Sequence, residues 1–209
     1  MEEQRDPVVR QYARGARDYD RRWSSYVRAT TRETLARVQL HPGGRLLDIG
    51  CGTGALLEAL AARYPQCAFA GVDSTPEMLA VARERLPEAV DLRAAHAERL
   101  PFAEAAFDAV VSCNMFHYLR EPKAALAEFR RVLKPGGRLI ITDWCDDYLA
   151  CKVCHLFLSV FDPAHWTVYG TTRCRNLLEE SGFSGIRVEA YRISWLWGMM
   201  TAVAVNESM

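Results

Sequence analysis

A glycine-rich turn constrains this chain more than any other feature of its sequence. The letters LLDIGCGTG occupy residues 46–54, where a short apolar run leads into three alternate glycines, Gly50, Gly52 and Gly54. The apolar run is typical of a buried parallel strand, and helical spacing of apolar residues begins directly after it. Glycine tolerates positive φ and has no Cβ, so a ligand can lie against the backbone of such a turn. The pattern predicts an α/β fold with a nucleotide-type site.

The turn alone does not separate two kinds of nucleotide site. Gly50, Gly52 and Ala55 also satisfy the G-x-G-x-x-A fingerprint of dinucleotide-binding proteins, so a nicotinamide-dependent oxidoreductase is one reading. The full string, with Asp48 inside the strand end, resembles the first motif of class I S-adenosylmethionine (SAM)-dependent methyltransferases. That resemblance implies SAM as the cofactor. It also implies cofactor contacts along the turn, with Cys51 as a small filler and not a nucleophile: Asp48, Gly50, Cys51, Gly52 and Gly54.

Asp73 is the most specific cofactor candidate outside the turn. It ends the second predicted strand, about 25 residues beyond Asp48, near the spacing at which an acid meets a ribose. A carboxylate there can accept both ribose hydroxyls. Thr75 before Pro76 marks the start of a helix, with Thr75 as its cap. Neighbours of Asp73 are expected along the adenosine pocket: Ser74, Thr75 and Met78.

The segment HAERLPF at residues 96–102 resembles the family's Asp-Ala-x-x-Leu-Pro-Phe segment, whose acid and following backbone amide recognise adenine. Here His96 stands in place of the acid. An imidazole nitrogen can accept from the adenine amino group in one tautomer, while Ala97 offers its backbone N–H and Glu98 follows. An exposed loop histidine is the other reading of His96. With LKPGGRL at residues 133–139, the resemblance extends in order from residue 12 to residue 142.

Residues 1–40 are expected to form helices that cap the cofactor cleft. The string YDRRW at residues 19–23 is similar to the family's Tyr-Asp-x-x-Trp pattern. A tyrosine face attracts a sulfonium by cation–π contact, which makes Tyr12 and Tyr19 candidates for that role. Ordinary helix packing is the alternative for both tyrosines.

The predicted fourth strand, residues 107–113, directs attention to the methyl site. Open α/β sheets bind ligands outside the carboxyl ends of their strands, so Cys113 and Asn114 are expected to face the transferable methyl. Nucleic-acid and protein amino-methylases carry an Asn/Asp-Pro-Pro-Tyr motif here. This chain has Asn-Met-Phe-His instead, which disfavours those substrates. His117 is a candidate general base or a packing histidine, and the other candidate bases are Asp143, His155 and His165.

A cysteine-rich segment follows the last family motif. Cys145, Cys151, Cys154 and His155 contain one Cys-x-x-Cys pair, and helical spacing alone places the last three on one face. No metal is therefore predicted. Alternatives are a metalloid or thiol methyltransferase that uses these thiols with Cys113, and a non-catalytic SAM- or zinc-binding protein. Residues 143–170, rich in aromatic side chains, are expected to form a lid over the substrate.

The whole chain is expected to be one domain, residues 1–209, with a Rossmann-like doubly wound sheet. Seven strands, the last one antiparallel, should have helices on both faces. Lysine plus arginine equals aspartate plus glutamate, so the net charge is zero and no field favours nucleic acid. A charged start, no apolar run of bilayer length and scattered cysteines favour a cytoplasmic monomer or homodimer without a membrane segment. The resemblance is strongest to the ubiquinone- and menaquinone-biosynthesis group, which implies a small-molecule substrate.

Overall fold

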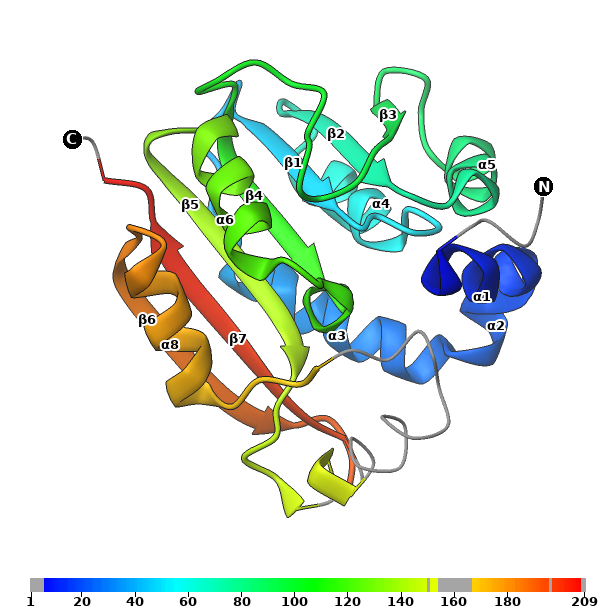
Figure 1. The fold of residues 1–209 in the computed structure, drawn as a ribbon. Helices are drawn as coiled ribbons and strands as arrows, with labels where there is room; N and C mark the ends of the chain where they lie inside the picture. Colours follow the sequence, from blue (N-terminus) through cyan, green and yellow to red (C-terminus); the bar gives the residue numbers. More distant parts are fainter. Residues whose placement is uncertain (1–5, 150, 154–166, 196, 208–209) are drawn as a thin grey trace.

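The computed structural model describes residues 6–149, 151–153, 167–195 and 197–207. Seven strands form one sheet in the order β3-β2-β1-β4-β5-β7-β6. The strands are β1 (Arg45–Ile49), β2 (Ala68–Asp73), β3 (Asp91–Ala94), β4 (Phe107–Cys113), β5 (Leu133–Trp144), β6 (Ser184–Arg192) and β7 (Gly198–Val205). Pairs among β1 to β5 are parallel, and β7 is antiparallel to both β5 and β6. The expected doubly wound topology is confirmed (Figure 1).

Helices cover both faces of this sheet (Figure 1). In chain order they are α1 (Pro7–Gly15), the 3-10 turn η2 (Ala16–Asp18), α2 (Tyr19–Arg22), α3 (Ser24–Arg37), α4 (Ala55–Arg63), α5 (Pro76–Arg85), the 3-10 turn η3 (Phe116–Tyr118), α6 (Pro122–Val132) and α8 (Thr171–Glu180). Prolines begin α1, α5 and α6, where a missing N–H costs nothing. None of the described helices is long and apolar enough to cross a membrane.

Two hydrophobic cores form because side chains alternate along each central strand. Leu47 and Val110 pack with α6 and α8 on one face. Leu46 and Val111 pack with α4 and α5 on the other. Since both faces of β1 and β4 are covered, these strands are buried at nearly every position and mostly apolar, which explains the apolar runs in the sequence.

The first helices place a cap beside the carboxyl ends of the strands (Figure 1). The Asp6 carboxylate accepts from the Val8 N–H at 2.8 Å and so caps α1. Thr75 holds the N-cap position of α5, but its side chain makes no capping hydrogen bond. Its backbone N–H instead donates to Asp73 Oδ1 at 2.8 Å. The backbone of Thr75 therefore holds the Asp73 carboxylate, whereas its hydroxyl does not cap the helix as expected.

Candidate active site

One cavity of about 210 Å³ lies where the cap meets the carboxyl ends of β1, β2 and β4. Fourteen of the fifteen predicted cofactor residues line it: Tyr12, Tyr19, Asp48, Gly50, Cys51, Gly52, Asp73, Ser74, Met78, His96, Ala97, Glu98, Cys113 and Asn114. Gly54 is not among the lining residues. Three positions distant in sequence, the cap, the turn and the end of β4, thus meet at one place.

The three glycines of the turn differ in what surrounds them. All have positive φ, at 75°, 54° and 81° for Gly50, Gly52 and Gly54. A Cβ on Gly50 would lie 2.7 Å from the Cβ of Met115 and closer still to its Cγ, while one on Gly54 would collide with Leu86. A Cβ on Gly52 would meet no atom within 4 Å. Only Gly52 therefore leaves open space at the cavity, whereas Gly50 and Gly54 make room for packing.

Asp48 is a buried carboxyl with an unmet hydrogen-bonding need. It is 2% exposed at the end of β1, and its Oδ1 has no hydrogen-bond partner among the described residues. Burial raises the pKa of Asp48 to about 8, and the nearby Asp73 carboxylate adds to the rise. A buried acceptor without a partner is costly, and a cationic ligand group would relieve that cost.

Asp73 is held in place by two backbone amides. Its Oδ2 accepts from the Gly52 N–H at 2.9 Å, and its Oδ1 accepts from the Thr75 N–H at 2.8 Å. Burial raises the pKa of Asp73, and these hydrogen bonds oppose the rise. A carboxylate has about four lone-pair sites. The Thr75 side chain hydrogen-bonds this carboxylate as well, so at least one acceptor site of Asp73 stays available for a ligand hydroxyl.

Three tyrosines stand on the cap side of the cavity. The rings of Tyr12 and Tyr19 lie 5.7 Å apart, and the hydroxyls of Tyr12 and Tyr118 are 2.8 Å apart. Burial raises the pKa of Tyr12 and of Tyr19, so both remain neutral phenols with intact π faces. Tyr118 was not predicted. Its position just after the carboxyl end of β4 could have indicated that it lines the cavity.

Two of the four predicted catalytic residues form a buried pair. His117 Nδ1 lies 2.7 Å from Asp143 Oδ1, and the His117 N–H donates to Asp143 Oδ2 at 3.0 Å. The His117 ring stacks on Trp144, with centroids 5.2 Å apart and an interplanar angle of 13°. Neither His117 nor Asp143 is among the residues that line the cavity. His155 and His165 lie outside the described residues.

Asn114 has a fixed side chain at the end of β4. Its φ of 60° is unusual for a residue with a Cβ. Tyr26 Oη donates to Asn114 Oδ1 at 2.8 Å, and Asn114 Nδ2 donates to Thr30 Oγ1 at 2.8 Å. Trp144 Nε1 donates in turn to Tyr26 Oη at 2.6 Å. Tyr26 and Thr30 were not predicted as supports, although both lie within residues 1–40, where cap helices are expected.

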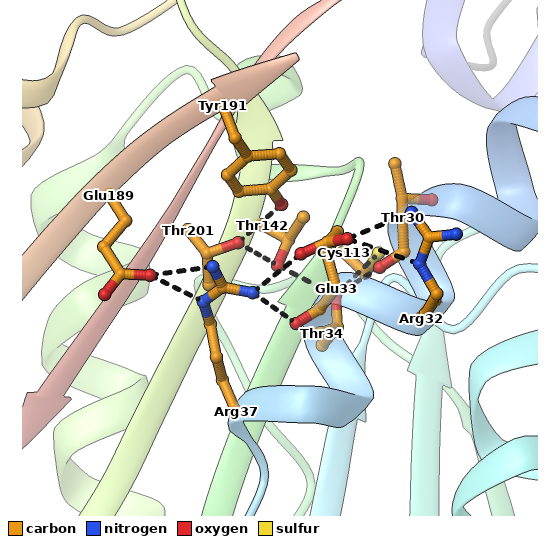
Figure 2. A network of polar contacts seen from close by, with 10 residues as sticks. All are labelled: Thr30, Arg32, Glu33, Thr34, Arg37, Cys113, Thr142, Glu189, Tyr191 and Thr201. Carbon is orange, nitrogen blue, oxygen red and sulfur yellow. Dashed lines mark hydrogen bonds and ion pairs between the residues drawn. The ribbon is translucent and has the colours of Figure 1, made fainter. Parts of the chain in front are cut away.

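A row of buried hydroxyls joins α3 to the sheet (Figure 2). Thr34 Oγ1 lies 2.8 Å from Thr142 Oγ1, which lies 3.0 Å from Thr201 Oγ1. The Tyr191 hydroxyl is 2.8 Å from Thr201 Oγ1. Thr34 is also 3.4 Å from Cys113 Sγ, at the cavity wall. The row ties the helix behind Asn114 to β5, β7 and β6.

The described cysteines are free thiols, and four of the six are buried. Burial raises the pKa of Cys113, Cys145 and Cys174 to about 12 each, so they are neutral at physiological pH. Cys151 is 1% exposed and its Sγ contacts the backbone of Gly198. Within the described ranges no three metal-ligating side chains come together. Cys154 and His155 lie outside those ranges. Neutral buried thiols do not favour a site for a soft metalloid.

The chain is similar in sequence to known methyltransferases. The protein family described as a methyltransferase domain matches residues 47–141. An O-methyltransferase of Penicillium expansum is 31% identical over 78% of this chain and 60% of its own length. A phosphatidylethanolamine N-methyltransferase of Cereibacter sphaeroides is 35% identical over 66% of this chain and 68% of its own length. The chain spans about half to three fifths of the length of several other curated relatives.

A solved structure shows the same fold. A SAM-dependent methyltransferase from Thermotoga maritima aligns over 94% of this chain and 98% of its own, with a TM-score of 0.77 and 20% identity. At that identity the likeness concerns the arrangement of strands and helices. The Cereibacter relative, by contrast, matches at the level of sequence over two thirds of both chains.

Proposed function

Because the chain belongs to the class I SAM-dependent methyltransferases, we propose that it transfers the methyl group of SAM to an oxygen, nitrogen, sulfur or carbon atom of a small molecule. The convergence of Asp48, Gly52 and Asp73 on one cavity carries the proposal. A net charge of zero supports a small acceptor and no nucleic-acid partner. Relatives named for O- and N-methylation support an acceptor of this size.

The residues of the cavity fit SAM. The unpaired Asp48 Oδ1 suits the ammonium of the methionine part, and the open space at Gly52 admits a ligand against the backbone. Asp73 would accept from the ribose hydroxyls, while His96 and Ala97 would border the adenine. When bound, SAM supplies a methyl group on a sulfonium that is already activated for displacement. The chain's own task is then to align the two reactants and exclude water.

His117 is our candidate for moving the acceptor's proton. Its Nδ1 lies 2.7 Å from Asp143 Oδ1, so Nε2 is the ring nitrogen that would take the acceptor's proton. The Thr167 N–H donates to the His117 carbonyl at 3.1 Å, which links this residue to the end of the 143–170 segment. We therefore propose that the acceptor binds on the His117 side, with residues 143–170 as its lid. His155 and His165 remain candidate bases within that lid.

The surroundings in which the protein works can also be proposed. Six described cysteines are free, which supports a reducing compartment such as the cytoplasm. We propose a single domain that acts as a monomer or homodimer, with residues 1–40 as the cap over the cofactor. The cap's contacts with the cavity support this division.

Titration calorimetry with SAM and with S-adenosylhomocysteine tests the proposal most directly. We expect micromolar binding of both ligands by the wild type and a loss of at least tenfold in affinity for Asp73→Ala. Thermal unfolding of both proteins would show whether the variant is folded. A folded wild type that binds neither ligand would overturn the proposal. Methyl transfer from labelled SAM to panels of small acceptors would then identify the substrate.

A further inference from the structure

One polar cluster fastens the cap to the glycine turn. Thr53 Oγ1 donates to Asp20 Oδ1 at 2.8 Å, and the Arg85 guanidinium pairs with Asp20 Oδ2. Arg85 Nη1 also donates to the Thr53 carbonyl at 3.0 Å. Asp20 belongs to α2, Thr53 to the glycine turn and Arg85 to the end of α5. Three separate segments around the cavity are thus joined at a single carboxylate, which we call the Asp20 latch: Asp20, Thr53 and Arg85.

The latch differs from the ordinary surface ion pairs of the cap. The Asp20 and Arg85 side chains are 28% and 23% exposed, whereas those of the neighbouring pair Asp18–Arg21 are 69% and 83% exposed. Partly buried, charge-assisted hydrogen bonds with several partners hold geometry better than exposed pairs do. Arg85 faces one further acid, since its Nε lies 3.7 Å from Glu58 Oε2. The Asp18–Arg21 pair stays within the cap and therefore fixes nothing across the cavity.

The latch lies next in sequence to a residue of the cavity. Tyr19 lines the cavity, whereas Asp20 and Arg85 are not among its lining residues. Asp20 follows Tyr19 directly on α2, so fixing the Asp20 carboxylate against the turn limits how far the Tyr19 ring can move from the cavity. Tyr12 packs against Tyr19 and shares that restraint.

We propose that Asp20 and Arg85 are positioning residues that hold the Tyr19 ring against the sulfonium of SAM, and so set the preference for SAM over S-adenosylhomocysteine. This inference rests on the proposed function. An aromatic face attracts a cation but gains no such energy from a neutral thioether. A correctly held ring therefore favours SAM over the product by about 3- to 30-fold. A loosened ring forfeits part of that ratio.

Calorimetry on a set of variants tests the inference. The quantity to compare is the Kd for S-adenosylhomocysteine divided by the Kd for SAM. We expect this ratio to fall about 3- to 30-fold in Tyr19→Leu and by part of that amount in Asp20→Asn, and the double variant to fall no further than Tyr19→Leu. Asp18→Asn is the matched control, because it removes the neighbouring exposed carboxylate, and its ratio should equal that of the wild type. Arg85→Met tests the latch from its other side, should Asp20→Asn fail to fold.

A conservative Arg85→Lys variant, which keeps the charge on a single donor group, should restore part of the ratio that Arg85→Met loses. Equal weakening of both ligands with an unchanged ratio would reduce the latch to a structural contact and overturn the inference. A wild type that binds neither ligand would instead overturn the proposed function. The two failures are therefore distinguishable.

Discussion

His117 and Asp143 contact each other twice, once through the imidazole and once through the backbone. Nδ1 of His117 lies 2.7 Å from Oδ1 of Asp143, and the N–H of the same residue donates to Oδ2 at 3.0 Å. Asp143 Oδ1 also accepts from the Trp144 N–H at 2.7 Å. A carboxylate bound in this way fixes both the position of the histidine and the tautomer of its ring.

His117→Ala should separate turnover from cofactor binding. Because we propose that the acceptor binds on the His117 side, we expect kcat to fall about 10²- to 10⁴-fold while the Kd for SAM changes less than twofold. Calorimetry and single-turnover methyl transfer measure the two quantities. Unchanged turnover would remove His117 from the candidate bases.

Stability of the ligand-free protein should depend on pH through Asp48. Its folded pKa of about 8 exceeds the ordinary carboxyl value, so between about pH 4 and pH 8 the folded state holds a proton that the unfolded state has lost. The free energy of unfolding should therefore fall as pH rises through this range, by about 1 kcal/mol per pH unit. Urea titrations at several pH values measure the slope. Asp48→Asn should flatten it, and an equal slope in that variant would contradict the assignment.

Gly50→Ala should destabilise the fold by more than its backbone conformation alone requires. Gly136 has the same φ of 75° and open space around it, so Gly136→Ala gives the cost of conformation, about 1–2 kcal/mol. Gly50→Ala adds the collision with Met115 and should cost about 1–3 kcal/mol more. Urea unfolding of both variants makes the comparison. Equal costs would show that Met115 moves aside freely.

Thr142→Val should weaken the link between α3 and the sheet. The substitution keeps shape but removes a hydroxyl 2.8 Å from Thr34 Oγ1 and 3.0 Å from Thr201 Oγ1. We expect a loss of about 1–3 kcal/mol in the free energy of unfolding, because two buried hydroxyls each lose one hydrogen-bond partner. Thr172→Val, at an exposed position of α8, should change stability by less than about 0.5 kcal/mol. A Thr142→Val protein as stable as the control would show that the hydroxyl row contributes little.

The sheet was predictable because its strands obey local rules. Buried parallel strands favour apolar runs, and glycines with positive φ mark the turn between β1 and α4 and the first part of β5, so short segments of sequence carry both signals. The cofactor side of the cavity follows from the same segments. Residues at strand ends, such as Asp48 and Asp73, share one edge of the sheet in any doubly wound fold.

The supporting contacts could not be predicted, since their partners are far apart in sequence. Tyr26 meets Asn114 across 88 positions, and Asp20 meets Arg85 across 65. No periodicity links such positions. At Thr75 the predicted position was correct but the predicted contact was wrong. Thr75 holds the N-cap position of α5, yet its hydroxyl does not cap the helix, and its backbone N–H donates to the Asp73 carboxylate.

The attachment of the cap also bears on how the chain folds. On a ribosome α1 and α2 emerge before any strand, yet Tyr12 pairs with Tyr118 across 106 positions. Contacts of such long range form late, after the intervening chain has closed its loops. The cap is therefore synthesised before the sheet yet is among the last parts to dock, and until β4 and η3 are in place its tyrosines lack their final partners. A cap that docks last is also the part most easily released from an otherwise complete sheet.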